Sequence, residues 1–109
     1  MTATTLGYVT RTDIGAFRGP LRTLSFRGDI DVTPISDKTS PAHPDYKVSA
    51  SGVEVGAGWV NINQTTGKPY VRLVVAHPDI SPRTIKINLG RAAGQDDDDV
   101  FALIWNPED

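Results

Sequence analysis

Residues 53–75 read Val-Glu-Val-Gly-Ala-Gly-Trp-Val-Asn-Ile-Asn-Gln-Thr-Thr-Gly-Lys-Pro-Tyr-Val-Arg-Leu-Val-Val. β-Branched and aromatic side chains alternate with small ones, which predicts a long β-hairpin with arms Val53–Ile62 and Pro69–Val75. The turn is residues 63–68, with Gly67 at positive φ because glycine has no Cβ to clash there. We expect the rest of the chain to fold around this hairpin.

The two faces of the first arm differ in character. Strict alternation groups Trp59 with three small apolar residues, which predicts that its indole points into the interior. The residues that share this face are Val53, Val55 and Ala57. The other face carries Glu54, Gly56 and Gly58, so it is nearly bare and permits close approach of another element or a ligand.

The remainder of the chain also favours strands. Ten glycines and eight prolines interrupt it, and no window of a dozen residues has a helical apolar period. Further strands are expected at 6–12, 17–27, 30–35, 46–51, 84–89 and 100–105. Alternation slips near Arg22 and Thr23, which predicts a bulge or bend there. Seven or eight short strands predict a small antiparallel barrel, OB-like or similar, with a sandwich as second choice.

Length and composition bound the possibilities. The 109 residues predict one all-β domain over 1–109, with mobile loops at 36–45 and 91–99. Without cysteine, no disulfide, zinc thiolate or cysteine nucleophile is available. No signal peptide and no apolar run of about 20 residues is present, so we expect a cytoplasmic protein without a membrane segment.

Charge is unevenly spread along the sequence. All eleven basic side chains lie in residues 1–94 with seven acidic ones, whereas residues 95–109 carry six acidic side chains. The body is therefore mildly basic and the last segment acidic. This balance is far from that of a strongly basic nucleic-acid-binding domain.

Several segments resemble, in order, a family of small bacterial proteins catalogued as domain of unknown function family seven hundred and thirty-six. They are Leu21-Arg22-Thr23-Leu24, Pro44-Asp45-Tyr46-Lys47-Val48, Gly52-Val53-Glu54-Val55-Gly56-Ala57-Gly58-Trp59, Gly67-Lys68-Pro69-Tyr70-Val71 and Phe101-Ala102-Leu103-Ile104-Trp105. The resemblance implies a short cytoplasmic protein without assigned activity, encoded on plasmids and other mobile elements. It also implies a role in the biology of transferred DNA. This chain departs from the family in its run of aspartates at 96–99 and in Ala76-His77-Pro78-Asp79.

Both histidines sit in the same tetrapeptide, Ala-His-Pro-Asp, at 42–45 and 76–79. Such a repeat invites interpretation as a paired His/Asp metal or general-base site. His-Pro-Asp is also ordinary turn chemistry, because proline fixes φ and aspartate bonds to its own backbone. We favour the turns and expect no metal site and no cofactor.

Catalytic signals are weak. No nucleophile elbow, phosphate-binding loop or zinc-protease motif occurs. Glu54 is the one carboxylate in the arms of the predicted hairpin, and we expect it to be solvated or hydrogen-bonded rather than a buried acid. The prediction is that the protein is not an enzyme.

Two binding hypotheses remain. Asp96, Asp97, Asp98 and Asp99 lack the spacing of a calcium loop. They form a solvated acidic segment that would suit a basic protein partner, and exposed strand edges would add pairing with a partner or a second copy. The alternative is single-stranded nucleic acid, with Tyr46 and Tyr70 stacking on bases and Lys47 and Arg72 contacting phosphates. The first prediction is a non-enzymatic binding or adaptor protein, with homodimerisation compatible with either hypothesis.

Overall fold

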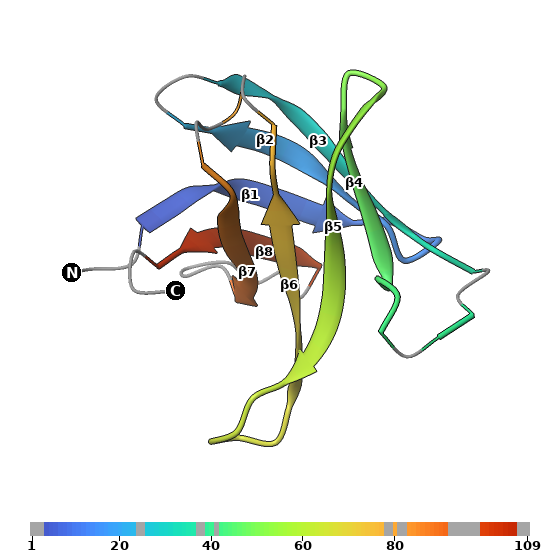
Figure 1. Ribbon diagram of the computed structural model, residues 1–109. Helices are drawn as coiled ribbons and strands as arrows, with labels where there is room; N and C mark the ends of the chain where they lie inside the picture. Colours follow the sequence, from blue (N-terminus) through green and yellow to red (C-terminus); the bar gives the residue numbers. More distant parts are fainter. Residues whose placement is uncertain are drawn as a thin grey trace.

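The chain folds into eight β-strands, as Figure 1 shows for the computed structural model. The structure describes residues 4–23, 26–36, 39–40, 42–77, 80, 83–91 and 99–106, and of Arg91 it describes the backbone alone. The strands are β1 Thr4–Arg11, β2 Phe17–Arg22, β3 Arg27–Pro34, β4 Tyr46–Ala50, β5 Val53–Ile62, β6 Pro69–Val75, β7 Ile85–Arg91 and β8 Val100–Trp105. Within these described residues, no helix is long and apolar enough to cross a membrane.

The strands close into one antiparallel barrel in chain order, and β8 returns to pair with β1. The predicted all-β class and barrel are therefore confirmed, and the sandwich is not formed. Each strand pairs with its neighbours in sequence, so the connectivity is an eight-stranded meander rather than the five-stranded Greek key of an OB-fold. Because the strands alternate in direction, every second connection lies at the same end of the barrel. We call the end with the connections β1–β2, β3–β4, β5–β6 and β7–β8 the hairpin end.

Apolar side chains fill the interior. Alternate strand residues point inward and are fully or almost fully buried. They include Val9, Phe17, Leu21, Ile30, Val32, Val48, Leu73, Val75, Ile87, Leu89 and Leu103. The ring of Phe17 closes the hairpin end against Phe101 and Tyr46, with centroid distances of 5.3 and 5.9 Å. At the opposite end, Ile80 is 1% exposed and packs in the same core.

The hairpin predicted at 53–75 has the expected bounds. Both arms begin and end at the predicted residues, and Gly67 has φ 73°. Its tip projects beyond the barrel body in Figure 1. Ser51 and Gly52 form the tight turn into β5 with φ 51° and 79°.

The single strand expected over 17–27 is wrong. The chain reverses there, because Thr23 N–H donates to the carbonyl of Phe26 at 2.8 Å, and β2 then pairs with β3. The slip in alternation at Arg22 and Thr23 marks a sharp bend, which was one of the two predicted alternatives, and not a bulge.

The inward orientation expected for Trp59 is also wrong. The register of β4 with β5 shifts between Val48 and Ser49, which places a bulge at Val55 and reverses the parity of the residues beyond it. Gly56 and Gly58 therefore face the interior, opposite buried Val75 and Leu73. Ala57 and Trp59 face outward.

Candidate functional site

The outer surface of β4 to β7 gathers aromatic and basic side chains. Tyr70 and Arg72 lie on the side of β6 opposite to the buried Leu73, and residues paired across antiparallel strands share a face. The register extends this surface to neighbouring strands. We call it the aromatic–basic face; it comprises Lys47, Trp59, Asn61, Tyr70, Arg72, Lys86 and Asn88.

The side chains of this face lie in two neighbouring rows that run across the strands. In one row Arg72 lies between Trp59 on β5 and Asn88 on β7, both directly paired with it. In the next row Lys47 pairs with Ala57, which pairs with Val74, which pairs with Lys86. The two lysines are exposed, whereas Trp59, Tyr70 and Arg72 are half-buried. Opposed side chains have Cβ atoms about 5 Å apart, so an indole, a guanidinium and an amide lie next to one another.

The connection between β3 and β4 fixes the outer surface of β5. Asp45 N–H donates to the carbonyl of Gly58 at 2.8 Å, and its carboxylate accepts from Val60 N–H at 2.9 Å. Trp59 Nε1–H donates to the carbonyl of Ala42 at 3.2 Å. These bonds hold the indole in one orientation on the surface.

Three of the four predicted nucleic-acid contacts meet on this face, and the fourth does not. Tyr70 and Arg72 share one side of β6, as predicted, and Lys47 lies two strands away on the same surface. Tyr46 is placed elsewhere, because it pairs with inward-facing Gly58 and its ring packs edge-on against Phe17. Its role is in the core.

The acidic run is described only at its last residue; Asp96, Asp97 and Asp98 lie outside the described residues. The Asp99 carboxylate accepts from Arg11 Nε at 3.0 Å and Nη2 at 2.8 Å, and its carbonyl accepts from Arg11 N–H at 2.7 Å. Arg11 in turn lies 5.5 Å above the ring of Phe101. Asp99 thus anchors the start of β8, a role that its sequence context did not signal.

The two histidines do not form a pair. His43 lies on the β3–β4 connection at the hairpin end, and His77 lies on the β6–β7 connection at the opposite end. His43 Nδ1 is 3.2 Å from Thr39 Oγ1, and the carbonyl of His77 accepts from Ile80 N–H at 3.0 Å. Pro78 and Asp79 of the second tetrapeptide lie outside the described residues. The described part of the chain holds no group of three metal-ligating side chains.

Sequence reasoning placed Trp59 in the core and did not assign Asn88 to a site. The signal for Asn88 was present, because the alternation of Ile85, Ile87 and Leu89 puts it outside. The position of Trp59 depends on the bulge at Val55, and the signal for it was Gly56, because a glycine inside a strand often marks a bulge.

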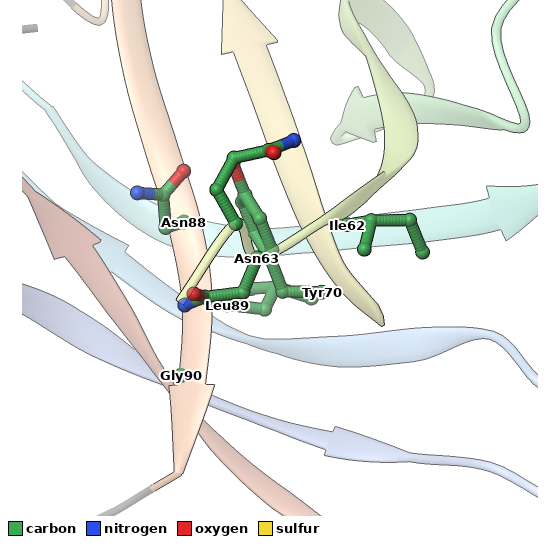
Figure 2. Close-up of a pocket in the computed structure, with 7 residues that line it drawn as sticks. Ile62, Asn63, Tyr70, Asn88, Leu89 and Gly90 are labelled. Atoms are coloured by element: carbon green, nitrogen blue, oxygen red, sulfur yellow. The ribbon is translucent and has the colours of Figure 1, made fainter. Parts of the chain in front are cut away.

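A concave pocket of about 410 Å³ lies at the lower edge of the aromatic–basic face, where the β5–β6 turn meets β6 and β7 (Figure 2). Its walls are Ile62, Asn63, Gln64, Tyr70, Asn88, Leu89 and Gly90. Tyr70 is the one titratable side chain in this wall.

Comparison with known proteins gives one match. A family model described as Protein of unknown function (DUF736) matches residues 5–108, which agrees with the resemblance found in the sequence. No curated protein and no solved structure matches the chain.

Proposed function

This chain belongs to the family Protein of unknown function (DUF736), and we propose that it is a non-enzymatic protein that binds single-stranded nucleic acid on its aromatic–basic face. The observation that carries the proposal is the juxtaposition of Trp59, Arg72 and Tyr70 on adjacent strands of the outer surface. Aromatic rings stack on unpaired bases, and a neighbouring cation contacts the phosphates between them.

The charges around this cluster favour a nucleic acid over a protein. Lys47 and Lys86 flank the row of Trp59 and Arg72, and lysine is depleted in protein–protein interfaces. Glu54 is the one carboxylate among the outward strand residues of β4 to β7, and its partner Ser49 is close to the opposite end of the barrel. The Asp45 carboxylate also lies beside β5, where it is bonded to Val60 N–H. A phosphate backbone would therefore meet a positive surface locally, although the whole chain carries a formal charge of −2.

Support for a protein partner is weaker in the described residues. A closed barrel has no free strand edge for pairing with another chain. Asp99, the described member of the acidic run, is bonded to Arg11 within the molecule. A protein partner or a second copy remains the alternative that the binding experiment must separate.

A non-enzymatic role accords with the shape of the molecule. Close-packed side chains fill the barrel, Glu54 is exposed, and the pocket wall holds a single titratable group. Binding to unpaired strands would also suit the role in transferred DNA that the family resemblance implies, since such DNA passes through single-stranded forms.

The test is a titration of fluorescent single-stranded oligonucleotide, followed by anisotropy at low salt and again at higher salt. We expect binding that weakens steeply with salt, because each phosphate contact releases counterions. Tyr70→Ala should weaken binding by about fivefold or more, since stacking on one base contributes about 1–3 kcal/mol. Arg72→Gln should weaken it and flatten the salt dependence.

The matched control is Arg22→Gln, which removes the same charge from β2 on another part of the barrel wall. It should change affinity far less than Arg72→Gln, and thermal melts should show that each variant is folded. Absence of binding at low salt, together with self-association or capture of a basic protein, would replace this proposal with the protein-partner alternative.

A further inference from the structure

The amide of Asn88 is an unsatisfied group at the wall of the pocket. Its Oδ1 atom is buried from solvent, and it has no hydrogen-bond partner among the described residues. A buried acceptor without a donor is destabilising, so such an atom points to a donor that binds there. Figure 2 shows the side chains of Asn88 from β7, Tyr70 from β6 and Asn63 from the turn close together at this pocket.

The opposite wall is held in place by the turn. Asn63 Oδ1 accepts from Thr65 N–H at 2.8 Å and from Thr66 N–H at 3.1 Å, so this amide shapes the turn. A further bond joins Asn63 N–H to the carbonyl of Lys68 at 2.9 Å. The pocket is therefore formed by hydrogen-bonded backbone on one side and by two side chains, Tyr70 and Asn88, on the other.

We propose that this pocket takes one unstacked nucleobase that carries its amino group at the position of adenine N6 or cytosine N4. The base stacks against the Tyr70 ring. Neighbouring side chains move aside to open Asn88 Oδ1, and the amino group of the base donates to it, which satisfies the buried acceptor. Thymine presents a carbonyl oxygen where these bases present the amino group, so two acceptors would face each other. The volume of about 410 Å³ lies in the range of small-ligand sites, about 300–1,000 Å³.

This inference deepens the proposed function and rests on it for the strand context. The aromatic–basic face would bind any single strand, and the pocket at its edge would add a preference among bases. A single hydrogen bond contributes about 0.5–1.5 kcal/mol, which corresponds to roughly a threefold to tenfold preference.

The test compares oligo-dC, oligo-dA and oligo-dT of one length on the native protein and on Asn88→Leu. Because strand flexibility also differs between these oligonucleotides, the informative quantity is the change in the dC/dT and dA/dT affinity ratios between the two proteins. We expect both ratios to fall by about threefold to tenfold in Asn88→Leu. Thr10→Leu is the control, since Thr10 is an exposed residue of β1 outside both the pocket and the aromatic–basic face; it should leave both ratios unchanged.

A second measurement separates the pocket from strand binding. Millimolar deoxycytidine monophosphate is added to ¹⁵N-labelled protein, and the side-chain amide signals of Asn88 are identified as those missing from Asn88→Leu. A change in the chemical shifts of these signals with deoxycytidine monophosphate, and none with thymidine monophosphate, would support base binding in the pocket even if no oligonucleotide bound. Unchanged ratios in Asn88→Leu, or signals that do not move, would overturn it while leaving strand binding on the rest of the face untouched.

Discussion

Gly56 is the residue at which the packing of the central hairpin is decided. A Cβ built on it would lie 2.1 Å from the backbone carbonyl oxygen of Val74, and one built on Gly58 would lie 2.7 Å from Leu73 Cδ2. Only glycine allows β5 to approach β6 this closely while turning its outer surface toward solvent. Gly56 and Gly58 share a face, as predicted, but the bulge puts Glu54 on the other side, and the close neighbour of the glycines is the molecule's own β6 rather than a ligand.

Replacing Gly56 with alanine should therefore be costly. The carbonyl of Val74 is part of the backbone and cannot rotate away, so β5 must shift and the Trp59 side of the sheet must shift with it. We expect Gly56→Ala to lower the free energy of unfolding by about 3 kcal/mol, the upper part of the usual range for overpacking. Urea denaturation followed by circular dichroism measures it.

Gly67→Ala serves as the comparison for that measurement. Gly67 has φ 73°, and a Cβ added there would have nothing within 4 Å, so only backbone strain of about 1–2 kcal/mol is expected. A loss at position 56 no larger than the loss at position 67 would contradict close packing as the cause.

At the scale of the elements, alternation of side chains predicted which segments are strands better than it predicted which way they face. The bounds of β5, β6 and β8 agree with the prediction, because proline, glycine and polar residues mark their ends. The orientation of Trp59 could not be predicted from alternation alone, because a one-residue bulge at Val55 reverses parity and depends on pairing with β4. Likewise the Arg11–Asp99 pair joins residues 88 positions apart, which local sequence does not bring together.

The β3–β4 connection should control the indole of Trp59. Asp45 bonds to β5 through both its backbone and its carboxylate, and Ala42 accepts the indole N–H. Asp45→Ala should cost about 1 kcal/mol for one lost charge-assisted bond near solvent. Without this bond between the β3–β4 connection and β5, the indole of Trp59 should become more accessible to solvent.

Fluorescence can follow this change. In a Trp105→Phe background Trp59 is the single tryptophan, and Asp45→Ala should shift its emission to longer wavelength and increase quenching by acrylamide. Asp13→Ala, in the exposed β1–β2 connection, provides the control and should leave both readings unchanged. An unchanged spectrum in Asp45→Ala would show that β5 alone fixes the indole.

For the whole molecule, closure and charge distribution together determine how it meets other macromolecules. The eight-stranded barrel leaves side chains, not backbone edges, as its means of recognition. Its body measures 33 × 32 × 28 Å, comparable to the Debye length of about 30 Å at 0.01 M salt. At low salt, every charge on the molecule therefore acts on a strand bound to the aromatic–basic face.

Asp96, Asp97 and Asp98 directly precede Asp99 in the sequence, and Asp99 forms an ion pair with Arg11 on the barrel. Because they repel phosphates, the combined change Asp96→Asn, Asp97→Asn and Asp98→Asn should strengthen oligonucleotide binding on the order of threefold to tenfold at about 0.01 M salt. At about 1 M salt the Debye length is about 3 Å, and the gain should disappear. The matched control replaces the same three residues with glutamate, which keeps the charge and should leave binding unchanged. Weaker binding in the asparagine variant, at any salt concentration, would instead mean that the acidic segment itself contacts the ligand. The binding site would then include this segment as well as the aromatic–basic face.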